Sequence, residues 1–123
     1  MTLNEIAAEL VAGCREGREV ENLHKLYSPD AVSVEAADMG GGRESKGIDA
    51  ILAKHEWWGA NQIVHSFDVE GPFPHGDDRF AVIFEMDTEN KQSGRRDQMR
   101  EVAVYHVKDS KIVREEFFYP TGG

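Results

Sequence analysis

The feature that most constrains the fold is a change of hydrophobic period at Gly59. Before Gly59, apolar residues recur at the three- and four-residue spacing of helices, and after it they alternate with polar residues as in strands. Helices followed by a run of antiparallel strands are typical of the α+β class, with the helices covering one face of a meander. A sheet of this length curls, and a curled sheet capped by helices encloses a cavity.

The apolar spacing predicts three helices. The first covers residues 3–16, with Thr2 and Glu5 as capping residues at its N-terminus. The second runs from Val20 to Tyr27 and is ended by Pro29, because the residue before a proline avoids helical geometry. The third carries an apolar stripe that consists of Ile48, Ile51, Leu52, His55 and Trp58.

The remaining segments read as strands. Four of them, at residues 62–71, 79–89, 97–108 and 111–119, are rich in β-branched and aromatic residues and are separated by glycine, proline and aspartate. A shorter strand after Pro29 places Ala31, Ser33 and Glu35 on one face. It leads into Gly40-Gly41-Gly42, which we interpret as a flexible lid.

Composition excludes several kinds of partner. The formal net charge is −9, and phosphate binding needs clustered lysine and arginine, so we expect neither nucleic acid nor a membrane surface as a partner. No run approaches the ~18 apolar residues of a membrane span. The five histidines form no close pair of the kind that binds zinc, so no metal site is expected. The single Cys14 favours a reducing cytoplasm, and 123 residues suit a single domain, residues 1–123.

The order of elements and several motifs resemble the SnoaL-like branch of the nuclear transport factor two superfamily. The motifs are Tyr27-Ser-Pro-Asp30-Ala31, Lys46-Gly47-Ile48-Asp49-Ala50-Ile51 and the final hairpin VYHVKDSKIVREEFFY. The resemblance covers nearly the whole chain. It implies helices packed into a strongly curved sheet of mixed or antiparallel strands, a cone-shaped half-barrel with a pocket at its open end. The fold hosts isomerases, cyclases, dehydratases and plain binding modules.

The relative with the closest mechanism is ketosteroid isomerase. Counting from the shared tyrosine motif, its general-base aspartate falls on Glu35, and two supporting tyrosines fall on Tyr27 and His55. Its two oxyanion donors fall on Val11 and Ala103, which cannot donate a hydrogen bond from their side chains. The resemblance therefore implies Glu35 as a base, with Tyr27 and His55 orienting it or relaying protons.

The same comparison fixes which residues of the late strands face the cavity. It implies that Glu85, Glu101 and Glu115 form one acidic wall, where mutual repulsion would raise at least one pKa. The other residues expected to line the pocket are Trp58, His65, Met99, Tyr105, Val113, Phe117 and Tyr119. The alternatives are that the strand parity slips by one residue, that Glu35 ends a solvated strand, and that His55, His65 and Trp58 only pack. Of Trp57 and Trp58, adjacent on a helix, we expect only Trp58 to face inward.

The opposite face would carry Val102, Val104 and His106, and the resemblance implies a homodimer through this convex surface. We expect the pocket to take a small, mainly apolar organic molecule. If the protein is an enzyme, the expected chemistry is cofactor-free acid–base catalysis beside a carbonyl, as in isomerisation, cyclisation or dehydration. The alternatives are a non-catalytic ligand-binding or dimerisation domain, and a protein–protein adaptor.

Overall fold

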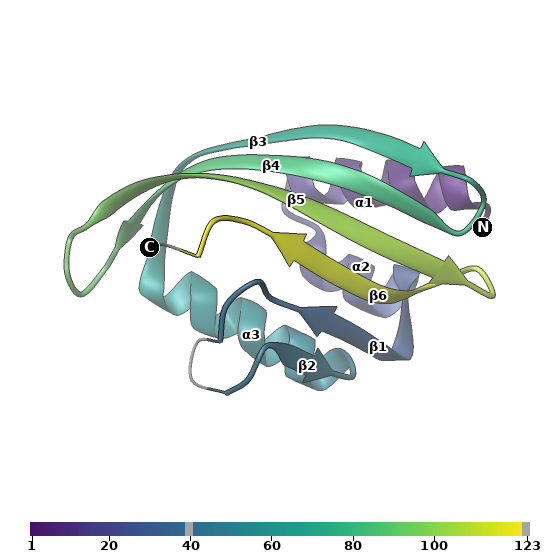
Figure 1. Ribbon diagram of the computed structural model, residues 1–123, viewed down its shortest axis with the longest axis horizontal. Helices are drawn as coiled ribbons and strands as arrows, with labels where there is room; N and C mark the ends of the chain where they lie inside the picture. Colours follow the sequence, from purple (N-terminus) through teal and green to yellow (C-terminus); the bar gives the residue numbers. More distant parts are fainter. Residues whose placement is uncertain (39–40, 122–123) are drawn as a thin grey trace.

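The computed structural model describes residues 1–38 and 41–121 and has helices on one side of a curved sheet (Figure 1). Within these residues the strands form one six-stranded sheet in the order β2-β1-β6-β5-β4-β3. All neighbouring strands are antiparallel except β1 and β6, which are parallel. The expected α+β class is therefore confirmed. The elements are α1 Leu3–Glu16, α2 Glu19–Leu26, β1 Tyr27–Val34, β2 Glu44–Lys46, α3 Ile48–Asn61, β3 Gln62–His75, β4 Arg79–Asn90, β5 Arg96–Lys108 and β6 Lys111–Phe118.

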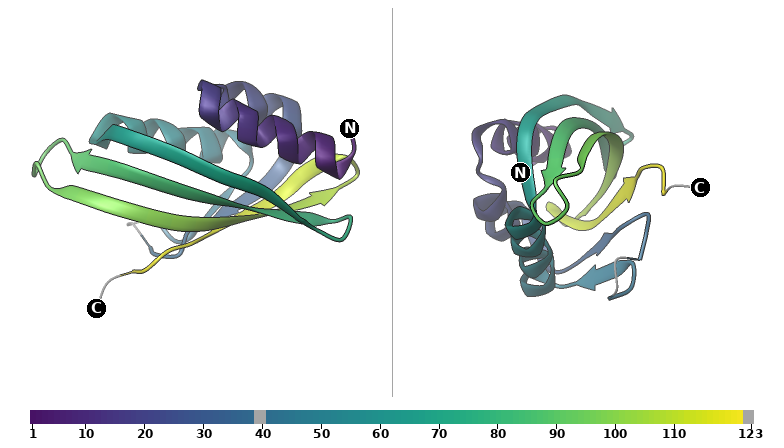
Figure 2. Two further views of the ribbon diagram at one scale, coloured as in Figure 1. Left: turned by 90° about the horizontal axis from the view of Figure 1, so that it is seen from above. Right: turned by 90° about the vertical axis from the view of Figure 1, so that its left-hand side faces the viewer.

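The sheet curls around its long axis and leaves an open side that the helices cover. Figure 2 shows this along the strands, where the sheet bends from β3 at one edge to β2 at the other. Helix α1 packs on β3, and α3 packs on β1 and β2. This is the half-barrel that the resemblance to the SnoaL-like family implies. Among the described residues, no helix combines the length and the apolar character that crossing a membrane requires.

Helix α1 has the bounds that its sequence predicts. Thr2 and Glu5 form a reciprocal capping box, and Gly17 ends the helix at a positive φ of 75°, a conformation that costs other residues more. Its apolar face, which includes Ile6 and Leu10, is buried against the sheet. The helix is thus specified at both ends and along one face.

The second helix ends one residue earlier than predicted. Tyr27 already has extended geometry and pairs with Ile112 of β6, so β1 begins there. Pro29 lies inside β1 instead of just ending the helix. Strand β2, the three polar residues Glu44–Lys46, was not predicted; it pairs with β1. Because α2 runs directly into β1, Tyr27 is the first residue of the strand, and it is buried in the core.

The register of β4 and β5 decides which side chains face the helices. Phe80 pairs with Tyr105, and their stacked rings, with centroids 5.0 Å apart, are central to the core. Two residues further along each strand, the same face carries Val82 with Ala103 and then Phe84 with Glu101. Residues between these positions point to the convex face.

A bulge in β6 changes one expected orientation. His106 pairs with Arg114 and Val107 pairs with Ile112, so Val113 is an extra residue between these pairs. Beyond the bulge Ile112, not Val113, is fully buried in the core. The prediction that Val113 faces the cavity is therefore wrong.

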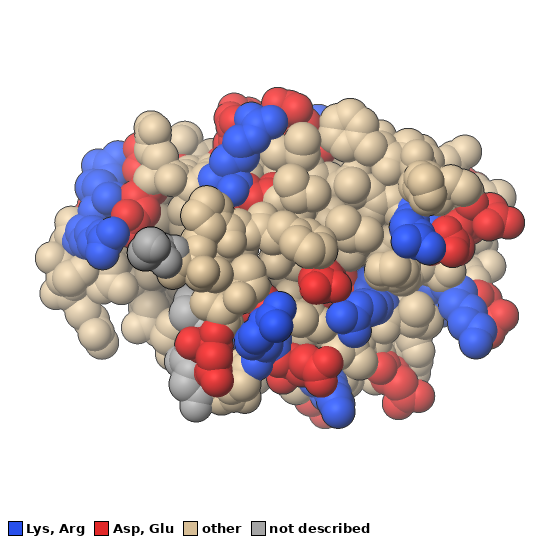
Figure 3. Space-filling model, in the orientation of Figure 1, with Lys and Arg blue, Asp and Glu red and all other residues tan. Residues whose placement is uncertain are grey.

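The convex face of the sheet is partly apolar. Val102 and Phe118, which pair across β5 and β6, have 37% and 50% of their surface exposed. Figure 3 views this side of the molecule and shows an area without charged side chains over the right-hand halves of β4 and β5, with charged side chains to its left and below it.

Candidate functional site

A cavity of about 800 Å³ lies between the curved sheet and the helices α2 and α3. Its walls are largely aromatic and thioether side chains, and this size and character suit a small organic molecule. The apolar wall residues are Trp57, Trp58, Val64, Phe67, Phe84, Met86, Met99 and Phe117, together with Leu10, Val20, Leu23 and Leu52.

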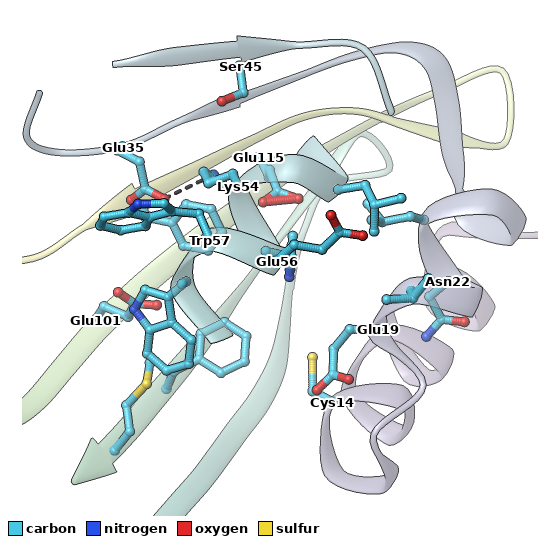
Figure 4. Close-up of a pocket in the computed structure, with 18 of the residues that line it drawn as sticks. Cys14, Glu19, Asn22, Glu35, Ser45, Lys54, Glu56, Trp57, Glu101 and Glu115 are labelled. Carbon is cyan, nitrogen blue, oxygen red and sulfur yellow. Dashed lines mark ion pairs between the residues drawn. The ribbon is translucent and has the colours of Figure 1, made fainter. Parts of the chain in front are cut away.

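Most of the residues singled out from the sequence line this one cavity. They are Tyr27, Glu35, His55, Trp58, Met99, Glu101, Tyr105, Glu115, Phe117 and Tyr119. Glu85 and His65 do not belong to the lining. Figure 4 shows Glu35 and Glu101 on one side of the cavity, with Glu19 and Cys14 across from them.

Glu85 lies on the convex face, so the acidic wall expected to include it is wrong. It pairs across the strands with Arg100 and forms an ion pair with that residue, with 47% of its side chain exposed. Its neighbour Phe84 points into the cavity instead. The parity of β4 is shifted by one residue relative to the prediction, and the carboxyl groups that gather in the cavity are those of Glu35, Glu101 and Glu115.

His65 is displaced from the cavity by an irregularity in β3. The register with β4 shifts between Val64 and Ser66, so His65 is the additional residue. Its Nε2 lies 2.9 Å from Oε1 of Glu89. The cavity is lined by Val64 and Phe67 in its place. The expected pocket position of His65 is therefore wrong.

Glu35 follows the last residue of β1 and is half-buried. Its Oε1 lies 2.9 Å from Nζ of Lys54 on α3, and its Oε2 accepts a hydrogen bond of 3.0 Å from the hydroxyl of Tyr119. Only 24% of its side chain is exposed, so it is not the end of a solvated strand. The expectation that Tyr27 and His55 hold Glu35 is wrong, because Lys54 and Tyr119 occupy its two oxygens.

Tyr27 is hydrogen-bonded to Glu115 and not to Glu35. Its hydroxyl donates a short hydrogen bond to Oε1 of Glu115, and the hydroxyl of Ser33 donates to Oε2 at 3.1 Å. Glu115 is 1% exposed, and both of its oxygens have partners. Burial, reinforced by the charge of Glu115, raises the pKa of Tyr27 well above its ordinary value, so the phenol stays protonated and able to donate.

These two carboxyl groups belong to one polar network. Lys54 donates a short hydrogen bond to Oγ of Ser33, which in turn contacts Glu115. Contacts therefore run without a break from Tyr119 through Glu35 and Lys54 to the buried end of the cavity. Burial and then the charge of Glu35 raise the pKa of Tyr119 to about 12.

Glu101 is a cavity carboxyl group whose pKa is raised by its surroundings. It makes no hydrogen bond or ion pair with the described residues, and it is only partly accessible. Burial is the main cause that raises its pKa to about 7, and the nearby charge of Glu35 adds to this against the opposing charge of Lys54. Glu101 therefore keeps its proton up to nearly neutral pH, and Glu35, Lys54 and Glu101 act on one another electrostatically.

The mouth of the cavity is formed by α3 and the segment before β2. His55 lies there on an exposed part of α3 and makes no hydrogen bond or ion pair with the described residues. Both Trp57 and Trp58 line the cavity, so the expectation that only Trp58 faces inward is wrong. Of the predicted lid, Gly41 and Gly42 lie at the cavity, while Gly40 lies outside the described residues.

Cys14 also lines the cavity. Burial raises its pKa to about 12, so its sulfur stays a thiol and is a poor nucleophile. In the part of the chain that the structure describes, no three histidine, cysteine or acidic side chains are grouped so as to hold a metal ion.

Lys54 and Ser33 are two polar residues of the site that the sequence analysis missed. Lys54 follows Ile51 by three residues and precedes Trp58 by four, which puts it on the inward-facing stripe of α3. Ser33 has the same strand parity as Glu35. Both signals were present, but a lysine on an apolar stripe is easily dismissed because its stem can cover apolar surface while its charge reaches water.

The fold has clear counterparts among known proteins. The family model of the SnoaL-like domain matches residues 1–119, and the chain belongs to this family. A candidate SnoaL-like polyketide cyclase from Mesorhizobium loti is 38% identical, with a TM-score of 0.90 over 97% of this chain and 100% of that one. No curated protein matches the sequence.

More distant structures share the fold alone. A nuclear transport factor two-like protein from Burkholderia thailandensis has a TM-score of 0.85 at 19% identity, over 98% of this chain and 92% of that one. A Catenulispora acidiphila protein with a ketosteroid isomerase-like fold, in complex with trimethylamine, has a TM-score of 0.73 at 17% identity, over 98% of this chain and 88% of that one.

Proposed function

We propose that this protein binds a small, mainly apolar carbonyl compound and catalyses a cofactor-free acid–base reaction on it, in the class of isomerases and cyclases. One observation carries the proposal. Two carboxyl groups, Glu35 and Glu101, face one apolar cavity from different environments: Glu35 is held by two partners, and Glu101 has none and a pKa raised to about 7. Carboxyl groups whose environments differ in this way are suited to opposite roles in proton transfer.

Glu35 is the base in this proposal. It removes a proton from the carbon beside the carbonyl group and returns it to another carbon, so no cofactor is consumed. Glu101 is the acid, and its proton forms a hydrogen bond to the carbonyl oxygen as negative charge develops there. It lies two residues before Ala103, which occupies the position of an oxyanion donor in ketosteroid isomerase. A protonated Glu101 supplies a donor that Ala103 lacks.

Tyr27 and His55 take supporting roles. Tyr27 holds the buried Glu115 in place through a hydrogen bond, and Glu115 in turn contacts Ser33 at the wall of the cavity. His55 at the mouth is placed to exchange protons with solvent. Aromatic walls favour a flat, uncharged ligand. The trimethylamine bound to the Catenulispora protein supports the narrower point that this fold accommodates small molecules.

A non-catalytic ligand-binding protein is the second candidate. The observation in its favour is that Lys54 and Tyr119 already occupy both oxygens of Glu35, and a base must have a free lone pair directed at the substrate. The two candidates differ in what Glu35→Gln does: a binder keeps its affinity and has no turnover to lose, whereas an enzyme loses rate much more than affinity.

The test needs no knowledge of the natural substrate. Ketones with one or two rings are incubated with the protein in D2O, and loss of the proton beside the carbonyl group is followed by NMR. We expect exchange with at least one ketone, and a drop of about 10²-fold or more in its rate in Glu35→Gln and Glu101→Gln. Glu85→Gln, on the convex face, is the matched control and should exchange at the wild-type rate. Ketones that bind without exchange would establish the binder instead.

We further propose that two copies associate through the convex face. The support is its apolar surface, where the exposed Val102 and Phe118 and the partly exposed Ile83 come from three adjacent strands. An apolar patch of this kind commonly marks a protein interface. We also propose a cytoplasmic location, because the single Cys14 suits a reducing compartment.

A further inference from the structure

Lys54 places an ammonium group inside the cavity beside the two carboxyl groups of the proposed reaction. Its Nζ contacts Oε1 of Glu35 and Oγ of Ser33, and lies 5.0 Å from the centroid of the Phe117 ring. An ammonium has three N–H donors. The described residues thus offer two oxygen acceptors for three donors, and an aromatic face is a weaker partner than an oxygen. One donor is available to a ligand oxygen.

Among the ionisable side chains that line the cavity, carboxyl groups outnumber lysine and arginine. Its lining residues with a carboxyl group are Glu19, Glu35, Glu56, Glu101 and Glu115, and its lysine and arginine residues are Lys54 and Arg43. Arg43 is exposed, and its Nε donates to the backbone oxygen of Glu35, whereas Lys54 is held among the side chains within the cavity. A ligand that arrives as an anion is therefore repelled, and Lys54 is the cation placed to meet negative charge that appears inside the cavity.

Proton abstraction creates such a charge. When Glu35 takes the proton, it becomes neutral, and Lys54 loses the negative partner beside it. The electron pair of the broken C–H bond forms the C=C π bond of the enolate. The π electron pair of the C=O bond moves to the oxygen. The negative charge thus passes from Glu35 to the substrate oxygen, and the total charge of the cavity is unchanged.

We propose that Lys54 is a catalytic residue that binds the enolate oxygen during this transfer, and that the substrate accordingly enters as an uncharged carbonyl compound and not as a carboxylate. The inference rests on the proposed function, since it deepens the chemistry of the same site. It assigns to a helix residue the stabilising role that Val11 and Ala103 cannot perform. Because Lys54 is already in place in the folded protein, little reorganisation is needed when the charge moves.

4-Nitrophenol is a suitable probe, because its phenolate absorbs visible light and the phenol does not. It enters as a neutral molecule, and inside the cavity it can pass its proton to Glu35 and leave an oxyanion near Lys54. At a pH where the free probe is the phenol, we expect the bound probe to show the phenolate band. Lys54→Gln keeps an amide donor for Glu35 but removes the charge, and should raise the apparent pKa of the bound probe by about 1–2 units. Lys46→Gln, on the exposed strand β2, is the matched control.

The outcomes separate this inference from the proposed function. Loss of the phenolate band in Lys54→Gln but not in Lys46→Gln supports the inference. A band that survives Lys54→Gln and is lost in Glu35→Gln overturns it and leaves the proposed base intact. A band lost in Lys54→Gln and kept in Glu35→Gln supports Lys54 and contradicts Glu35 as the base. A wild-type protein that neither binds nor ionises the probe overturns the inference.

Kinetics provide a second readout with any ketone that exchanges. Lys54→Gln should lower the rate at saturation by about 10²-fold, with KM changed much less, because the lost interaction forms fully only as charge develops. A variant that raises KM and keeps the rate at saturation would contradict the role. If circular dichroism shows that Lys54→Gln does not fold, Lys54→Arg, which keeps the positive charge, is tested instead. A phenolate band retained in Lys54→Arg supports the inference, and its loss in a folded Lys54→Arg protein overturns it.

Discussion

Replacing Glu101 with glutamine should make the protein more stable at neutral and alkaline pH. In the folded protein the pKa of Glu101 is raised from an ordinary value of 4.5 to about 7, first because it is buried and then because Glu35 is near. In the unfolded chain it returns to the ordinary value. Below the lower pKa both states hold the proton, and between the two values only the folded state does. The free energy of unfolding therefore falls as pH rises from 4.5 to 7.

The size of this loss follows from the shift. A pKa difference of about 2.5 at ~1.4 kcal/mol per pH unit gives about 3.5 kcal/mol, and partial contact with solvent reduces this to about 1–3 kcal/mol. Urea unfolding followed by the fluorescence of Trp57 and Trp58, at intervals from pH 4.5 to 8, measures it. We expect Glu101→Gln to remove this part of the pH dependence, and Glu85→Gln, whose carboxyl group is exposed, to keep it. Parallel pH dependences for the wild type and Glu101→Gln would refute the reasoning.

Three further predictions concern the core, the network and the convex face. Tyr27→Phe deprives the buried Glu115 of one of its two donors and should lower the free energy of unfolding by about 2 kcal/mol in urea titrations; an unchanged midpoint would contradict the network. Phe80→Ala leaves a hole in the core and should cost about 3–5 kcal/mol, whereas Phe118→Ala, half exposed, should cost less than ~1 kcal/mol; equal losses would mean that the core is misplaced. Val102→Glu puts a charge on the convex face and should convert a dimer into a monomer in sedimentation velocity, so a dimer that persists would argue against this interface.

Local sequence was sufficient to predict the helices and the long strands. The capping residues of α1 and the apolar alternation of β5 and β6 each specify an element without tertiary information. Strand β2 could not be predicted, because Glu44–Lys46 are three polar residues that become a strand only by pairing with β1. The resemblance to the SnoaL-like family supplied the curvature and the position of the cavity.

The site was predicted less completely, for reasons that lie in the strands. The segment Phe80–Phe84 is apolar at every position, so its alternation does not reveal which face is inward, and the prediction for Glu85 failed. His65 was misplaced because a bulge is a feature of pairing and not of composition. Glu35 and Glu101 were placed correctly in the cavity. The partners of Glu35 were not predicted, since Lys54 comes from a helix that only the fold brings to Glu35.

The pH dependence of proton exchange is the most direct test of the roles proposed for Glu101 and Glu35. The measurement is the rate of exchange in D2O at saturating ketone, from pH 5 to 9, for the wild type and Glu101→Gln. If a protonated Glu101 is the acid, the wild-type rate falls as pH rises through about 7, and the slower variant shows no fall there. A wild-type rate that is level through pH 7, or that rises, would contradict the assignment of acid and base to this cavity.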